Sequence, residues 1–342
     1  EKRNIIDQTH TQLQLADDVQ AEVAQRIEDA QAQASSFIAT MCFSSNIPAS
    51  IAHLLKPISY ETFGPSDALF ESLNDWYDVI EVVKYNLIET GITKSSNHDF
   101  GYGLAIYLCA AYLLKQPILL TGHKAKDIAI AFAHAIDRGR YGELNCLGEY
   151  DHSAVHNIGK NHEKIVLLNN LITSNWINRA HELFAKPKVF FIATHSFKED
   201  LQVEPISLYN YVLPLITEFM VDQDKQVAYE LSSLSNELES SNTNDNYDDE
   251  ANISFSKLGL SPMVERNINR LSSTMMGIEQ KALASESCDK RNMLKIQELL
   301  TVLPLAYCTQ TLYQIKDDIL LHRQDDHEYM EINQRVRYLF RD

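Results

Sequence analysis

The chain has 342 residues, of which 45% are hydrophobic, and its formal net charge is -17. This length and apolar content exclude a wholly disordered chain and leave room for two or three domains. The negative charge repels phosphate backbones, so we expect no broad direct contact with nucleic acid.

The N-terminal region, residues 1–99, is predicted to be helical. From 4 to 43, apolar residues recur at helical spacing, and neither Gly nor Pro interrupts them. We interpret this stretch as one long amphipathic helix packed on its own domain, and a coiled-coil arm that reaches a partner is the alternative. Further helices are expected between 48 and 100, with breaks at Pro57, Gly64-Pro65 and Gly91.

The pattern changes to alternating strands and helices between residues 100 and 234. An apolar helix is predicted from Phe100 to Lys115, and two more helices at 127–136 and 176–184. Strands are predicted from apolar runs at 117–121, 164–168 and 188–193, and from the segment 143–147. Apolar strands separated by helices are typical of a parallel sheet covered on both faces. We therefore predict an α/β domain over this range.

Beyond this domain, residues 235–253 are rich in Ser, Asn, Asp and Glu, which predicts an acidic linker. Helical patterns resume in residues 254–342, which we expect to form a C-terminal, lid-like helical domain. Its helices are predicted at 262–284, 289–301, 305–321 and 328–340.

The turn after the first apolar run has part of the pattern of a phosphate-binding loop. Such a loop needs glycines, so that backbone N–H groups can wrap the phosphates, then a Lys for the phosphates and a Ser or Thr for magnesium. Here Gly122 is the one glycine that remains, and the loop is about two residues short. Lys126 stands near the lysine position, and Asp127 replaces the Ser or Thr. An ordinary strand-to-helix turn is the alternative.

Three later segments, in this order, resemble motifs of the AAA+ superfamily of P-loop ATPases, most closely its MoxR-like and GTP-dependent restriction branch. Residues 165–170 are similar to a Walker B strand, with Asn169 and Asn170 at the acidic pair. Residues 191–196 are similar to the strand that ends at sensor 1, with Ser196 at the usual Asn position.

The third segment, residues 213–219, is similar to the one that ends in the arginine finger, with Glu218 at the Arg position. Met263 stands where the sensor 2 Arg of the lid would be. The resemblance covers roughly residues 100–222. It implies a P-loop NTPase-like parallel sheet, flanked by the N-terminal helices and the C-terminal lid-like domain.

Each departure from these motifs removes part of the chemistry that the resemblance implies. A carboxylate pair holds Mg²⁺ and polarises the attacking water, which the amides of Asn169 and Asn170 cannot do. Glu218 would oppose the transition-state charge that an arginine stabilises. We therefore predict a pseudoenzyme with no catalytic residue and no cofactor. Binding of ATP and magnesium through Lys124 or Lys126 is the alternative.

Cys146, His152, His156 and His162 are the candidate metal set, because the first two histidines could share a helix face. Their spacing matches no zinc signature, so we expect no metal and favour a polar connecting segment with scattered histidines.

Five cysteines without a CxxC pair fit a reducing compartment. The sequence contains no uninterrupted apolar stretch of about 18 residues, so we expect no membrane span. The start of the chain has no signal-peptide pattern. We therefore expect a cytoplasmic location. The chain begins at Glu1 instead of Met, which leaves open that it is a fragment of a longer protein.

These patterns together predict a non-catalytic AAA+-like scaffold or adaptor. Its expected partners are proteins, either an active ATPase or a like copy, in a larger assembly. The branch that it resembles suggests bacterial defence or DNA processing, by analogy only. The alternatives are an NTP-binding ATPase with an unorthodox P-loop and a purely helical adaptor whose apolar runs are buried helices.

Overall fold

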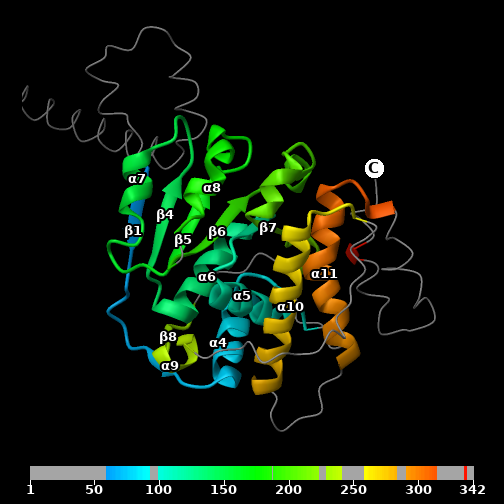
Figure 1. Cartoon of the computed structure of the whole chain (residues 1–342). Helices are drawn as coiled ribbons and strands as arrows, with labels where there is room; N and C mark the ends of the chain where they lie inside the picture. Colours follow the sequence, from blue (N-terminus) through cyan, green and yellow to red (C-terminus); the bar gives the residue numbers. More distant parts are fainter. Residues whose placement is uncertain are drawn as a thin grey trace, which may run out of the picture. The chain divides into compact units, whose positions relative to one another are not determined.

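The computed structural model describes residues 59–92, 99–186, 188–222, 229–240, 258–282, 290–313 and 335–336, all within one unit, Ser59–Asp342 (Figure 1). The helix predicted over residues 4–43, with its coiled-coil alternative, lies outside the described residues. Within the described ranges, no helix has both the length and the apolar content needed to cross a membrane.

A six-stranded sheet lies at the centre of this unit (Figure 1). In spatial order its strands are β1 (Tyr60–Phe63), β4 (Tyr141–Asn145), β5 (Ile165–Asn169), β6 (Phe190–His195), β3 (Ile118–Thr121) and β7 (Leu213–Ile216). β1 is antiparallel to β4, and all other neighbours are parallel. The predicted α/β class with a mostly parallel sheet is confirmed, and the alternative of a purely helical adaptor is wrong.

The apolar runs form the middle of this sheet because both of its faces are covered. Every residue of β3 is buried, and so are all but the last residues of β5 and β6. α6 (Ala125–Asp137) packs against β3, β4, β5 and β6. A strand that is covered on both sides needs apolar residues at every position, which explains why these runs do not alternate.

Two helices precede the first parallel strand. α4 (Trp76–Glu89) begins at Asp75, whose carboxylate accepts a hydrogen bond from the Asp78 N–H at 3.0 Å. It packs against α6 and against α5 (Phe100–Leu114), which is buried along most of its length. Near the end of α5, the ring of Tyr112 contacts the rings of Phe132 in α6 and Phe190 in β6, with centroids 6.1 and 5.8 Å away. These aromatic contacts fix α5 to the core beneath the sheet.

Short helical segments connect the later strands. They are α7 (His152–Asn157), η1 (Asn175–Arg179), α8 (Ala180–Leu183), η2 (Lys198–Gln202), η3 (Ile206–Asn210) and η4 (Glu218–Met220). The helix predicted over 176–184 is therefore divided between a 3-10 segment and a single turn of α-helix.

Residues 59–73 are not helical, so the prediction of helices throughout 48–100 is wrong there. β1 joins the central sheet, and β2 (Glu71–Leu73) pairs in parallel with β8 (Ser232–Leu234). These strands have three or four residues, and most side chains of β1 and β2 are exposed. Such short, exposed strands leave no apolar run or clear alternation by which to predict them.

The predicted linker is partly structured as well. Within residues 235–253, residues 236–240 form the short helix α9 (Asn236–Ser240). The linker prediction is therefore wrong for this part, and its remainder lies outside the described residues.

Two long C-terminal helices pack onto the unit. α10 (Pro262–Ala282) lies against α4 and α5, and α11 (Lys290–Cys308) lies against α5 and β7. The sequence predicted a break between residues 301 and 305, but α11 continues through Pro304. Proline removes one backbone hydrogen bond, and the buried neighbours Leu303 and Leu305 offset that loss by packing. Of the helix predicted over 328–340, only residues 335–336 are described.

Candidate functional site

The four segments that carry the ATPase-like motifs end at the same edge of the sheet. Gly122 follows β3, Asn169 ends β5, Ser196 follows β6 and Glu218 follows β7. β3 lies between β6 and β7, although these strands come later in the chain. In open α/β sheets, ligands bind at the carboxyl ends of the strands, at the point where the spatial order of the strands reverses. We call this the carboxyl edge and treat it as the candidate site.

The glycine turn is packed tightly against the end of β7. Gly122 has a φ of 122°, and a Cβ there would lie 2.7 Å from Oγ1 of Thr217, so only glycine fits. Its N–H donates to the carbonyl of His195 at 2.9 Å, and its carbonyl accepts from the N–H of Ala125 at 3.0 Å. Two N–H groups of the turn therefore bind the protein itself, and α6 begins directly behind it.

Both lysines of the turn have carboxylate partners. The ammonium of Lys124 lies 3.3 Å from the carboxylate of Asp127, one helical turn further on. The ammonium of Lys126 donates to Glu143 in β4 at 2.6 Å, with about half of the lysine side chain exposed. The carbonyl of Asp127 accepts from the hydroxyl of Tyr229 at 3.1 Å. The side chains of Lys124, Lys126 and Asp127 are thus paired with each other or with β4.

A polar chain crosses the ends of three neighbouring strands, and we call it the Glu143 chain. The Glu143 carboxylate accepts from both Lys126 and the amide nitrogen of Asn169. The amide oxygen of Asn169 accepts from the hydroxyl of Thr194 in β6 at 3.0 Å. The structure therefore joins the lysine position and the first position of the acidic pair through Glu143, a residue that the sequence did not indicate.

The second amide of the pair is held separately. Asn170 has a φ of 58°, and its side-chain nitrogen donates to the amide oxygen of Asn145 at 3.1 Å. The left-handed backbone conformation is one that Asn tolerates better than most residues. Both amides at this pair are therefore committed to neighbouring side chains on β4 and β6.

The sensor and finger positions follow β6 and β7, the two strands that flank β3. Ser196 is exposed, and Glu218 lies 3.7 Å from the ammonium of Lys198. Burial opposes the charge of Lys198, but its hydrogen bond to Glu199 and the charge of Glu218 raise its pKa. Glu218 is thus an acidic partner for Lys198 inside this unit. Met263, at the start of α10, is half exposed.

Apolar side chains gather in the chain segment that leaves the carboxyl edge after β6. Phe197, Val203 and Ile206 are 64%, 78% and 57% exposed, respectively. They lie within ten residues of each other on η2, η3 and their flanks, and we call them the Phe197 group. Exposed apolar residues that form one contiguous patch are typical of a surface that contacts another molecule.

The candidate metal set does not form a cluster. Cys146 is buried, which raises the pKa of its thiol, while His152, His156 and His162 are exposed. Among the described residues, no group of three or more His, Cys, Asp or Glu side chains could hold a metal ion.

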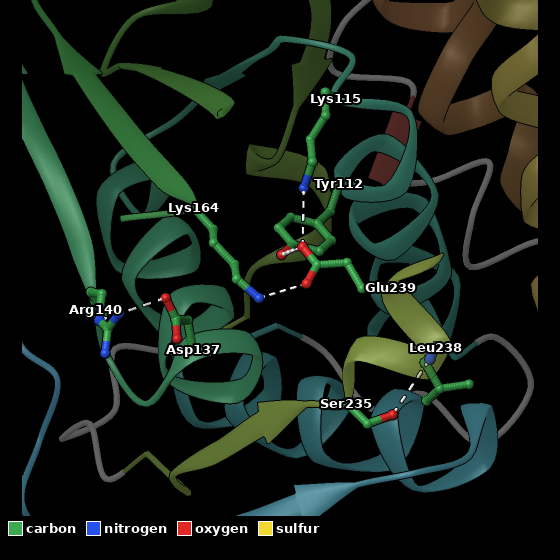
Figure 2. Close-up of polar contacts among 8 residues, drawn as sticks. All are labelled: Tyr112, Lys115, Asp137, Arg140, Lys164, Ser235, Leu238 and Glu239. Carbon is green, nitrogen blue, oxygen red and sulfur yellow. Dashed lines mark hydrogen bonds and ion pairs between the residues drawn. The ribbon is translucent and has the colours of Figure 1, made fainter. Parts of the chain in front are cut away.

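A second polar cluster lies at the opposite, amino edge of the sheet, and the sequence did not indicate it (Figure 2). The carboxylate of Glu239 in α9 accepts from the hydroxyl of Tyr112 at 2.6 Å and from the ammonium of Lys164 at 2.5 Å. The ammonium of Lys115 lies 3.6 Å from the same carboxylate. Three segments that are far apart in the chain therefore meet at one acidic side chain.

The environment of this cluster shifts the pKa values of its members. Burial lowers the pKa of Lys115 to about 8, and the charge of Lys164 acts in the same direction, against that of Glu239. Burial opposes the charge of Glu239, but its hydrogen bonds from Lys164 and Tyr112 lower its pKa. Asp137, 3.9 Å from Arg140, lies beside them, and burial raises its pKa.

No protein-family model, curated protein or solved structure matches this chain. A proposal for the function of this chain therefore rests on its sequence and on the geometry described above.

Proposed function

We propose that this protein is a non-catalytic scaffold or adaptor with an AAA+-like fold that binds protein partners. The observation that carries the proposal is the Glu143 chain. A single carboxylate engages both Lys126 and Asn169, the side chains at the positions of the ATPase lysine and of the first acidic residue. A triphosphate would need this lysine for itself.

The placement of the motif positions supports the AAA+-like interpretation of the fold. All four lie at the carboxyl edge, and the glycine turn joins a central parallel strand to the start of α6. This is the general setting of a phosphate-binding loop. Gly122 packs tightly against Thr217. This supports the view that the strand–turn–helix arrangement of a phosphate-binding loop is kept, while the turn itself is packed against the end of β7.

The charges at this edge argue against hydrolysis. Mg²⁺ prefers carboxylate, phosphate and water oxygens, and an activated water needs a base or a metal. Asn169 and Asn170 are neutral amides that already bind other side chains. Glu218 brings negative charge to the position of the arginine finger.

Protein binding is favoured by the Phe197 group at the same edge. Its three exposed apolar side chains stand on the segment that follows β6, so a partner placed there would bury them beside the closed nucleotide position. An active ATPase or a second copy of this chain is the partner that the resemblance implies. A role in bacterial defence or DNA processing rests on the branch resembled and on nothing else.

The rival function is an NTPase with an unorthodox loop, and nucleotide binding separates the two. Labelled ATP should show no saturable binding to the full chain, with or without magnesium. Micromolar binding that requires magnesium, with turnover that is lost in Lys126→Ala, would show the proposal to be wrong and the rival function to be right.

Partner binding is tested by purification of the native protein. We expect a co-purifying protein to be retained by the wild type and lost when Phe197, Val203 and Ile206 are all replaced by Ser. The matched control is Leu69→Ser, which removes an apolar side chain that is 99% exposed on another segment. Equal retention by all three proteins would remove the Phe197 group from the proposal.

A further inference from the structure

The last residue of β6 is a histidine at the carboxyl edge, directly before the Phe197 group. The Nε2 atom of His195 lies 2.7 Å from the carboxylate of Asp200 in η2, and the histidine side chain is only 14% exposed. The ring of His195 also contacts the ring of Phe197 edge-on, with centroids 6.2 Å apart. We propose that His195 is a pH-sensitive switch, which fixes residues 197–206 when its imidazole is protonated and loosens them when it is neutral. The role of this switch in partner binding rests on the proposed function, whereas the switch itself is testable without a partner.

A second carboxylate acts on the same imidazole. Burial raises the pKa of Glu204, and the charge of Asp200 acts in the same direction. The N–H of Thr173 and the charge of His195 act against them. The two acidic groups therefore repel each other, and a protonated His195 attracts both. When the imidazole is neutral, its hydrogen bond to Asp200 is weaker and the repulsion between the carboxylates is no longer offset.

The turn after β5 depends on Glu204 for its conformation. The Glu204 carboxylate accepts a hydrogen bond from the N–H of Thr173 at 2.7 Å, and Thr173 has a φ of 65°. A β-branched residue rarely adopts this left-handed conformation, which persists only where neighbouring contacts hold it. A displacement of Glu204 would remove this hydrogen bond and let the turn relax. The strain at Thr173 therefore provides the second state that a switch requires.

Other titratable side chains lie on the segments next to His195, namely the turn after β3, η2, η4 and α11. They are His123, Lys124, Lys198, Glu199, Glu218 and Tyr307. Both lysines have carboxylate partners, which are Glu199 and Glu218 for Lys198 and Asp127 for Lys124. His123 is exposed, on the turn whose Gly122 N–H donates to the carbonyl of His195. Asp200 and Glu204 are therefore the carboxylates through which protonation of His195 acts on the segment.

The switch loosens residues 197–206 and does not detach them. Leu201, in the middle of η2, is buried, and its carbonyl accepts from the hydroxyl of Tyr209 at 2.6 Å. The side-chain nitrogen of Gln202 lies 3.3 Å from the carbonyl of Tyr307 in α11. These neutral contacts keep the middle of the segment on the core near neutral pH. The flanking residues carry the Phe197 group, and they are the part that we expect to respond to pH.

Hydrogen exchange at two pH values tests the switch in the full chain. After correction for the intrinsic effect of pH on exchange, the protection of residues 197–206 should fall about fivefold or more from about pH 5.5 to about pH 8, which bracket the ordinary pKa of histidine, about 6.5. His195→Gln keeps an amide that can donate to Asp200 but does not titrate, so it should abolish the fall. The matched control is His156→Gln, at an exposed histidine on α7, which should behave like the wild type.

Asp200→Asn is the second variant, at a side chain that is 38% exposed, and it should at least halve the pH response. An undiminished response in either of these variants, or no response in the wild type, would overturn the proposal. A fall of the same size in β5 and β6 would mean that pH acts on the whole fold, and it would overturn the proposal as well.

Partner retention separates this inference from the proposed function. A surface that is already fixed loses less freedom on binding, so a protein that co-purifies through the Phe197 group should be retained better at about pH 6 than at about pH 8. The wild type should show this difference and His195→Gln should not. Equal retention by the wild type at both pH values would overturn the role of the switch in binding. Absence of any co-purifying protein would contradict the proposed function, while hydrogen exchange would still decide whether the switch exists.

Discussion

The two edges of the central sheet carry similar side chains in different surroundings. At the amino edge, Glu239 lies between two lysines that are only 20% and 33% exposed. At the carboxyl edge, Glu143 has one lysine, which is 48% exposed, and a neutral amide. Because water screens an exposed pair, the same acidic group should matter far more for stability at the amino edge.

The two edges therefore differ in how strongly their charged groups interact. The carboxyl edge carries the Lys126–Glu143 ion pair and hydrogen bonds of neutral side chains, Asn169 and Thr194. The charged groups that interact most strongly lie at the amino edge, where the sequence contains no recognised motif. The same conservative substitution at each edge would therefore measure the contrast.

The largest effect is expected for Glu239→Gln. The substitution keeps the size of the side chain but removes the carboxylate that Lys115 and Lys164 share, so the free energy of unfolding should fall by about 3 kcal/mol. Denaturant unfolding checks this, with Glu149→Gln as the exposed control, which should change by less than about 0.5 kcal/mol. A loss no larger than that of the control would mean that the amino edge is screened like a surface.

Gly122→Ala should come next, with a loss of about 2 kcal/mol in unfolding free energy. The new Cβ would meet Thr217 in addition to the cost of a positive φ. Gly148→Ala is the matched control, because Gly148 also has a positive φ, of 73°, but no atom within 4 Å of its Cβ position. Equal losses would show that the turn can move away from β7.

The pH dependence of stability should report the amino edge. Since the pKa of Lys115 falls from an ordinary 10.5 to about 8 on folding, the unfolded chain binds more protons than the folded chain between these values. The free energy of unfolding contributed by this group should therefore rise with pH, by about 1 kcal/mol from pH 7 to 9. Lys115→Met should lack this rise; an unchanged slope in the variant would assign it to other groups.

The smallest effect is expected for Glu143→Gln. Glutamine still accepts hydrogen bonds from Lys126 and Asn169, and the lost pair is half exposed, so unfolding free energy should change by less than about 1 kcal/mol. A loss as large as that of Glu239→Gln would erase the contrast between the edges. The same denaturant measurement serves both variants.

The middle of the sheet could be predicted because burial leaves a clear record in sequence. β3, β5 and β6 are apolar without alternation, and α5 is apolar almost all round. β1 and β2 could not be predicted in this way, since their side chains are mostly exposed and they contribute backbone hydrogen bonds to neighbours far along the chain.

The residues that organise both edges were harder to find. Glu143 and Glu239 are two of many acidic residues in an acidic chain, and only tertiary contacts set them apart. Glu143 did leave one signal, because a carboxylate near the start of a predicted buried strand needs a partner. Glu239 left none, since its neighbours in sequence apart from Leu238 are polar and fit a linker equally well.

The β7 border of the sheet limits how this protein can assemble. At one border of the sheet, β1 pairs with β4 in the antiparallel direction. At the opposite border, the N–H groups of Leu213 and Thr217 donate to β3 and its flanks. Because backbone N–H groups point to alternate sides of a strand, the nitrogen of Pro214, which carries no hydrogen, faces the open side of β7. α11 also lies against β7. Strand addition at the β7 border, and with it fibril-like stacking of copies through that border, is therefore disfavoured.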